Sequence, residues 1–160
     1  MMKRQWQRIW QPAAGGCAGG GCPGSRSQTF AAPAAEALPA ETCLGQWPVQ
    51  LRLVSPMAGF FDGADLLLAA DCSAFARGDF HARYMKGKVT VIGCPKLDPV
   101  DYSEKLTEIF RLHNIRSVTL VRMEVPCCGG LERAVQKALA ACGRPIPFES
   151  VTLSVRGEIL

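Results

Sequence analysis

The sequence predicts an α/β fold: a mostly parallel sheet with helices on both faces, in a Rossmann-like three-layer arrangement. Two observations carry this prediction. Aliphatic and β-branched runs alternate along the chain with stretches of helical periodicity. One of these runs, within ADLLLAADC at residues 64–72, is continuously apolar, as expected for a strand that is buried on both faces.

The strands are expected where apolar residues cluster between glycines, prolines and charged residues. The last strand is expected at an edge of the sheet, because its apolar residues alternate with polar ones. In chain order the predicted strands cover residues 49–54, 64–71, 89–93, 118–125 and 151–155.

Three helical segments fit between these strands. Residues 73–85 are expected to form a short or irregular helix, and residues 102–112 have the clearest amphipathic pattern. Asp101 or Ser103 is the expected cap of this second helix. Apolar residues at helical spacing over 131–139 predict the third helix.

Residues 1–46 are rich in Gly, Pro and Ala and lack sustained periodicity. We therefore expect a flexible or irregular N-terminal arm, followed by a cysteine-rich α/β domain over residues 47–160. Cys17 and Cys22 in the arm have a spacing that suits a pair of metal ligands, but also a mobile, glycine-rich linker.

Composition excludes several classes of function. The 18 Lys and Arg residues against 14 Asp and Glu are spread along the chain, so nucleic-acid binding is not indicated. No phosphate loop, Ser-His-Asp set or pair of carboxylates at helical spacing is present, which argues against kinase, hydrolase and glycosidase chemistry. The longest apolar run is far shorter than the roughly 20 residues that span a bilayer, so no membrane insertion is expected.

The 8 cysteines are not spaced like those of a small secreted scaffold, which favours a cytoplasmic protein with metal or redox use of its thiols. Cys72, Cys94 and the pair Cys127-Cys128 each follow a predicted strand. Because ligands of open α/β sheets bind outside the carboxyl ends of the strands, these four thiols are expected to converge on one edge.

Four thiolates are the ligands that a [4Fe–4S] cluster needs, and backbone N–H groups aimed at the sulfurs tune its potential. Gly129 and Gly130 are expected to take positive φ at the strand-to-helix turn and, with the positive end of the helix dipole, to favour thiolates there. The sequence therefore predicts an iron–sulfur cluster held by Cys72, Cys94 and the vicinal pair.

Three other interpretations of the thiols stay open. Zinc also takes four thiolates, although its structural sites usually use C-x2-C pairs. The thiols could serve thiol–disulfide exchange, or pack in the core without a ligand. Cys43 and Cys142 are assigned no role, and His81 and His113 are expected to be structural.

Four segments carry a resemblance to a known family: WPVQLRLV, GADLLLAADCSAFARGDFH, GKVTVIGCPKLD and VRMEVPCCGG. Over about residues 21–160 the chain resembles the cysteine-rich C-terminal region of bacterial and archaeal iron–sulfur-binding proteins of the 4Fe-4S ferredoxin type. The resemblance implies cluster binding and electron transfer. The N-terminal two-cluster ferredoxin module that usually precedes this region is lacking, since the chain has no C-x2-C-x2-C-x3-C-P run.

We therefore expect an iron–sulfur-cluster-binding protein that transfers electrons to a redox partner protein as part of a redox system. An electron carrier or redox accessory protein is expected rather than a stand-alone enzyme. The alternative is a zinc- or thiol-containing structural or interaction module without redox activity.

Overall fold

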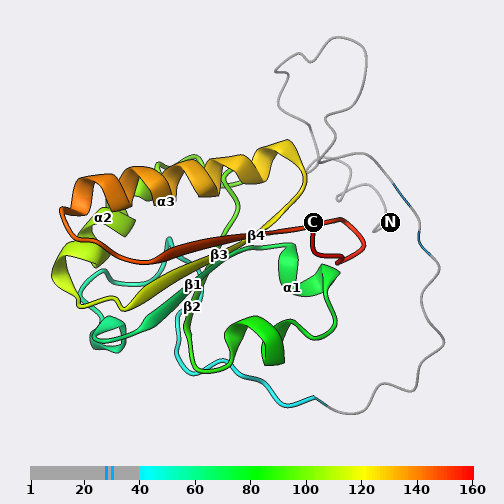
Figure 1. Cartoon of the computed structure of the whole chain (residues 1–160), viewed down its shortest axis with the longest axis horizontal. Coiled ribbons are helices and arrows are strands. Elements are labelled where there is room, and N and C mark those ends of the chain that lie inside the picture. The colour runs from blue at the N-terminus through cyan, green and yellow to red at the C-terminus, as the bar shows by residue number, and fades with distance from the viewer. Residues whose placement is uncertain (1–27, 29, 31–39) are drawn as a thin grey trace, which may run out of the picture.

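A computed structural model describes residues 28, 30 and 40–160 of the chain (Figure 1). Its centre is a sheet of four strands that all run parallel, in the order β2-β1-β3-β4. The strands are β1 (Asp65–Ala70), β2 (Val89–Gly93), β3 (Ser117–Met123) and β4 (Phe148–Leu153). The predicted fold class is confirmed.

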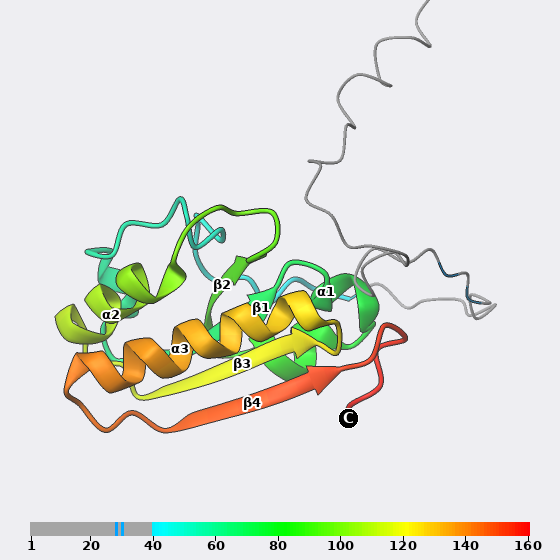
Figure 2. The same ribbon diagram turned by 90° about the horizontal axis from the view of Figure 1, so that it is seen from above.

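Helices cover both faces of the sheet. Helices α2 (Tyr102–Leu112) and α3 (Gly129–Cys142) lie side by side on one face, whereas α1 (Ser73–Ala76) and a π-helix at His81–Met85 lie on the other (Figures 1 and 2). Among the described residues, 3-10 turns lie at Gly59–Phe61 and Pro126–Cys128.

The core forms where apolar faces of these elements meet. Leu66 to Ala70 of β1 are at most 3% exposed, which is the burial expected of a parallel strand between two helical layers. From α2, Leu106, Ile109 and Phe110 belong to the same core at 0% exposure. The helical spacing of these three residues places them on one face, so the amphipathic pattern of α2 fixes its orientation.

The predicted first strand at residues 49–54 is wrong. Gln50 makes only an isolated parallel bridge to Ile92, on the outer side of β2, and the chain then turns through Leu51–Leu53. Leu51 and Val54 are nevertheless at most 1% exposed. Leu51 and Val54 are therefore apolar because they are buried, although the segment that carries them is a turn. Hydrophobic spacing alone does not distinguish such a segment from a strand.

The irregular helix predicted at 73–85 forms as two short pieces, α1 and the π-helix, separated by Arg77–Phe80. The arm predicted at residues 1–46 lies mostly outside the described residues, as do Cys17 and Cys22. Within the part of the chain that the structure describes, no helix is both long and apolar enough to cross a membrane.

The last residues of the chain fold back on the sheet. Leu153 pairs antiparallel with Ile159, and the Leu160 amide donates to the Thr152 carbonyl at 3.0 Å. This return covers the carboxyl-terminal part of β4, the edge strand whose existence the alternating pattern predicted.

The first turn of α2 is tied to α3 through Asp101. Its carboxylate caps α2 by accepting the Ser103 amide at 2.9 Å, and it pairs with the Lys137 ammonium of α3 at 2.7 Å. The bond from Lys137, followed by those from Ser103, holds the pKa of Asp101 at about 2, below its ordinary 3.8. Because the folded-state pKa is the lower one, the carboxylate stabilises the fold above about pH 4, and this stabilisation is lost as the pH falls through about 2.

We expect Asp101→Asn to lower the free energy of unfolding at pH 7, because the amide keeps the cap acceptor but loses the charge that pairs with Lys137. The difference from wild type should shrink between pH 4 and pH 2, as measured by urea unfolding followed by circular dichroism. Asp101→Ala, which also removes the cap, should be less stable than Asp101→Asn at every pH. A wild-type advantage over Asp101→Asn that is the same at pH 7 and pH 2 would contradict this role of the charge.

Candidate functional site

The four predicted thiols all lie just beyond the carboxyl ends of adjacent strands. Cys72 precedes α1, two residues after β1, and Cys94 follows directly on β2. Cys127 and Cys128 end the 3-10 turn that joins β3 to α3. Cys72 is exposed, Cys94 and Cys127 are half-buried, and Cys128 is buried at 5% exposure.

The sheet order places these cysteines around a topological switch point. From β1 the chain moves to β2 on one side, whereas β3 and then β4 lie on the other side of β1. In open α/β sheets the crevice at such a point, beyond the carboxyl ends of the strands, is where ligands bind. Cys72 and the vicinal pair flank the crevice between β1 and β3, and Cys94 lies one strand away.

The thiols affect the pKa values of one another. Burial raises the pKa of Cys72 above its ordinary value, and Cys94, Asp71 and Cys127 raise it further. Burial also raises the pKa of Cys128 to about 11, with contributions from Cys127 and Cys72. Cys72 therefore interacts electrostatically with each of the other three cysteines.

These pKa values correct one expectation. The helix dipole was expected to favour thiolates at the β3–α3 turn, but burial dominates there and keeps Cys128 protonated. The thiols share one edge without forming a closed set of ligands: among the residues that the structure describes, no three His, Cys, Asp or Glu side chains are grouped so that they could hold a metal ion.

The loop that carries Cys94 is held by a compact set of hydrogen bonds. The Cys94 carbonyl accepts the amides of Leu97 at 3.2 Å and Asp98 at 2.9 Å. The Cys94 amide donates to the Tyr102 hydroxyl at 3.0 Å, and this hydroxyl donates to the Asp98 carboxylate. Burial, followed by the bond to Asp98, raises the pKa of Tyr102 well above its ordinary value, so the hydroxyl keeps its proton.

Two glycines permit close contacts around this loop. A Cβ on Gly93 would lie 2.8 Å from the Tyr102 hydroxyl oxygen, and a Cβ on Gly130 would lie 2.9 Å from the Cβ of Pro95. The expected positive φ at Gly129 and Gly130 is wrong, since both are helical residues of α3 and Gly129 has φ −59°. Gly130 is needed for packing, because it lets the Cys94 loop rest on the start of α3.

A cavity of about 250 Å³ opens beside the site. It lies between the β2–α2 loop and α3. A second cavity of about 340 Å³ lies near the amino ends of β1 and β2. None of the four site cysteines lines either cavity. The first cavity is lined by Pro95, Val100, Asp101, Tyr102, Gly130, Arg133, Ala134 and Lys137.

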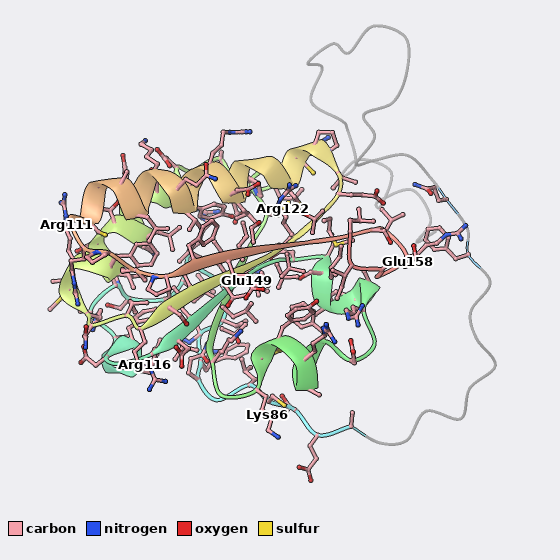
Figure 3. The ribbon with its side chains drawn as sticks, viewed as in Figure 1. Lys86, Arg111, Arg116, Arg122, Glu149 and Glu158 are labelled. Carbon is pink, nitrogen blue, oxygen red and sulfur yellow. The ribbon has the colours of Figure 1, made fainter. Side chains whose placement is uncertain are left out.

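Charged residues complete the surroundings of the site. Asp71, directly after β1, has its pKa raised mainly by burial, and its carboxylate accepts a bond from Gln50 at 3.5 Å. Arg122 leaves β3 toward α3, as Figure 3 shows, and pairs with Glu132 at 3.1 Å. Arg122 and Glu132 thus neutralise each other, and Gln50 holds the Asp71 carboxylate in place.

Both histidines make structural contacts. His113 is 7% exposed and bridges the Asp62 carboxylate and the Pro56 carbonyl, each at 2.7 Å. His81 accepts the amide of Cys43 at its Nδ1 at 3.1 Å, which holds residue 43 against the π-helix.

Tyr102 and Asp98 are the residues near the site that the sequence did not reveal. Tyr102 is predicted only as the first residue of an amphipathic helix, and Asp98 is assigned no role. The available signal was weak: a polar and an aromatic side chain within eight residues after a strand-ending Gly-Cys pair.

The pKa values predict an order of thiol reactivity. In the folded protein at pH 7, Cys72 should react with iodoacetamide at least about tenfold faster than Cys128, because Cys72 is exposed whereas Cys128 is buried and protonated. The Cys128 rate should keep rising between pH 7 and pH 10, still below its pKa of about 11. Peptide mass spectrometry measures both rates, and in 8 M urea they should become similar. Equal rates in the folded protein would refute the order.

Comparisons with known proteins agree with the sheet and its connections. A model of the Rossmann-like domain family matches residues 58–160, which is more than half of the chain. An uncharacterized protein of Archaeoglobus fulgidus is 35% identical over 115 residues, which cover 71% of this chain and 81% of that protein. The comparison with solved structures found no match.

These findings correct the resemblance to 4Fe-4S ferredoxin-type proteins. The matching family is defined by the α/β domain, and the archaeal relative is not described as a ferredoxin. Any function of the cysteines must therefore be argued from their own placement. The chain belongs to the Rossmann-like domain family.

Proposed function

We propose that this protein binds an iron–sulfur cluster through Cys72, Cys94, Cys127 and Cys128 and transfers electrons to a redox partner protein. One observation carries the proposal: three separate loops bring four thiols to the carboxyl edge of adjacent parallel strands, around the β1/β3 switch point.

The donor set suits such a group. Adjacent strands lie about 4.8 Å apart, so the ends of β2 and β3 on either side of β1 are roughly 10 Å apart. That span brings cysteines at both ends within reach of one cubane. Four soft thiolates select iron–sulfur clusters or zinc over harder metals. When bound, the cluster would supply one-electron redox chemistry.

The chain's own residues would orient and shield this group. Cys128 lies in the core, Cys72 lies at the surface, and each thiol would give up its proton on binding. Because three loops carry the four sulfurs, closing the ligand set would require rotation of the side chains between staggered rotamers and small loop movements.

The surface around the thiols supports an encounter with another protein. Phe75 is 94% exposed three residues after Cys72, and Leu97 is 76% exposed three residues after Cys94. Exposed apolar side chains beside a redox site favour docking of a partner protein. Free thiols in this number suit a cytoplasmic, reducing compartment.

Within the alternative of a zinc- or thiol-containing interaction module without redox activity, one observation favours the metal-free, thiol-containing form. No three possible ligands within the described residues are already grouped as a metal site would require. In that case the thiols pack the switch-point edge, and the same exposed apolar residues bind a partner.

Anaerobic reconstitution with iron and sulfide tests the proposal. We expect wild type to bind about four iron and four sulfide per chain, with visible charge-transfer absorption and a spin-resonance signal after reduction. Cys127→Ser and Cys128→Ser should each lose most of the iron, whereas the matched control Cys43→Ser should keep it.

Two results would decide against the ligand assignment. Stoichiometric zinc without iron or sulfide would replace the cluster by the alternative. Equal iron in all three variants would show that the vicinal pair is not a ligand. Circular dichroism identifies any variant that loses iron by unfolding, and Cys127→Ser then decides, because Cys127 is only half-buried.

A further inference from the structure

We propose that Tyr102 and Asp98 are positioning residues that fix the Cys94 thiol toward the other three cysteines. This inference rests on the proposed function, because it concerns the same four thiols. Neither residue carries a soft ligand atom, so both act through the backbone of Cys94.

The first step of the argument is the chain of hydrogen bonds. The Tyr102 hydroxyl accepts the Cys94 amide at 3.0 Å and donates to the Asp98 carboxylate. The amide of Asp98 in turn donates to the Cys94 carbonyl at 2.9 Å. The Cys94 carbonyl also accepts the Leu97 amide at 3.2 Å, so both peptide groups of Cys94 are engaged and the direction of its Cα–Cβ bond is restricted.

The second step is the rigidity of the two partners. Tyr102 is 4% exposed and its ring rests on the backbone of Gly93, where a Cβ would lie 2.9 Å from Cζ. Asp98 is half-buried and pairs with the Arg52 guanidinium at 3.5 Å. Because the hydroxyl is held from both sides, it sets the position of Cys94 and does not follow it.

The third step concerns what is lost without the hydroxyl. Phenylalanine at position 102 fills the same space but leaves the Cys94 amide and the Asp98 carboxylate without their partner. The β2–α2 loop is then free to shift, and the thiol loses its preferred direction. Groups that orient a metal ligand typically change metal affinity by about 10-fold to 100-fold when they are removed.

The test uses Tyr102→Phe and a matched control, Tyr84→Phe. Tyr84 is also buried, at 6% exposure, but its hydroxyl has no hydrogen-bond partner in the described residues. Both substitutions remove one buried hydroxyl, but only that of Tyr102 has hydrogen bonds, with the Cys94 amide and the Asp98 carboxylate. Asp98→Asn, which keeps an acceptor for the Tyr102 hydroxyl, and Asp98→Ala, which does not, form a second matched pair.

The first measurement is the rate at which iodoacetamide alkylates each thiol of the metal-free protein. Tyr102→Phe and Asp98→Ala should change the Cys94 rate by about threefold or more and leave the Cys43 rate unchanged. Tyr84→Phe should match wild type, and Asp98→Asn should lie nearer to wild type than Asp98→Ala. A Cys94 rate in Tyr102→Phe equal to that of wild type would overturn the inference.

The second measurement is a titration with Co²⁺ alone, followed by its thiolate charge-transfer and d–d absorption. Tyr102→Phe should bind Co²⁺ about 10-fold to 100-fold more weakly than Tyr84→Phe, with altered d–d bands. Equal affinities and equal bands would also overturn the inference. If wild type binds neither Co²⁺ nor a cluster, the proposed function fails, while the alkylation rates still decide whether the two residues position Cys94.

Discussion

The parallel pairing of β1 with both of its neighbours is the constraint on which the rest of the structure depends. Leu68 faces Val91 of β2 and Leu120 of β3, so the three strands run side by side in one register and direction. Their carboxyl ends must then lie at the same edge. Loops that are far apart in the sequence leave the sheet there together, and this alone gathers the cysteines at one place.

Sequence patterns predicted the strands and the helix in which the spacing of apolar residues matches the spacing of buried positions. The runs at β1, β2 and β3 and the amphipathic stripe of α2 each require a particular secondary structure, because no other places their apolar residues on buried faces. Residues 49–54 have a similar apolar pattern, but they form a turn in which only Leu51 and Val54 are buried. Whether this segment forms a strand depends on how it packs against β2, and the spacing of its apolar residues does not determine that packing.

The candidate site was predictable to the same extent. The placement of Cys72, Cys94 and the vicinal pair follows from the ends of the strands, which the sequence marks clearly. Their protonation does not, because the pKa of Cys128 depends on how deeply the finished core surrounds it. The bond between Tyr102 and the Cys94 amide was also out of reach, since it forms only after α2 has packed beside the end of β2.

The contact between Gly130 and Pro95 sets the distance between the Cys94 loop and α3, and no cysteine takes part in this contact. The missing side chain at position 130 lets the ring of Pro95 in the Cys94 loop lie against the start of α3, where a Cβ would be only 2.9 Å from the Cβ of Pro95. The methyl group of an alanine at position 130 would clash with Pro95. It would move the Cys94 loop away from α3 without changing any cysteine. Selection for a particular spacing of the thiols would therefore also act on Gly130, which has no side chain that could bind a ligand or react.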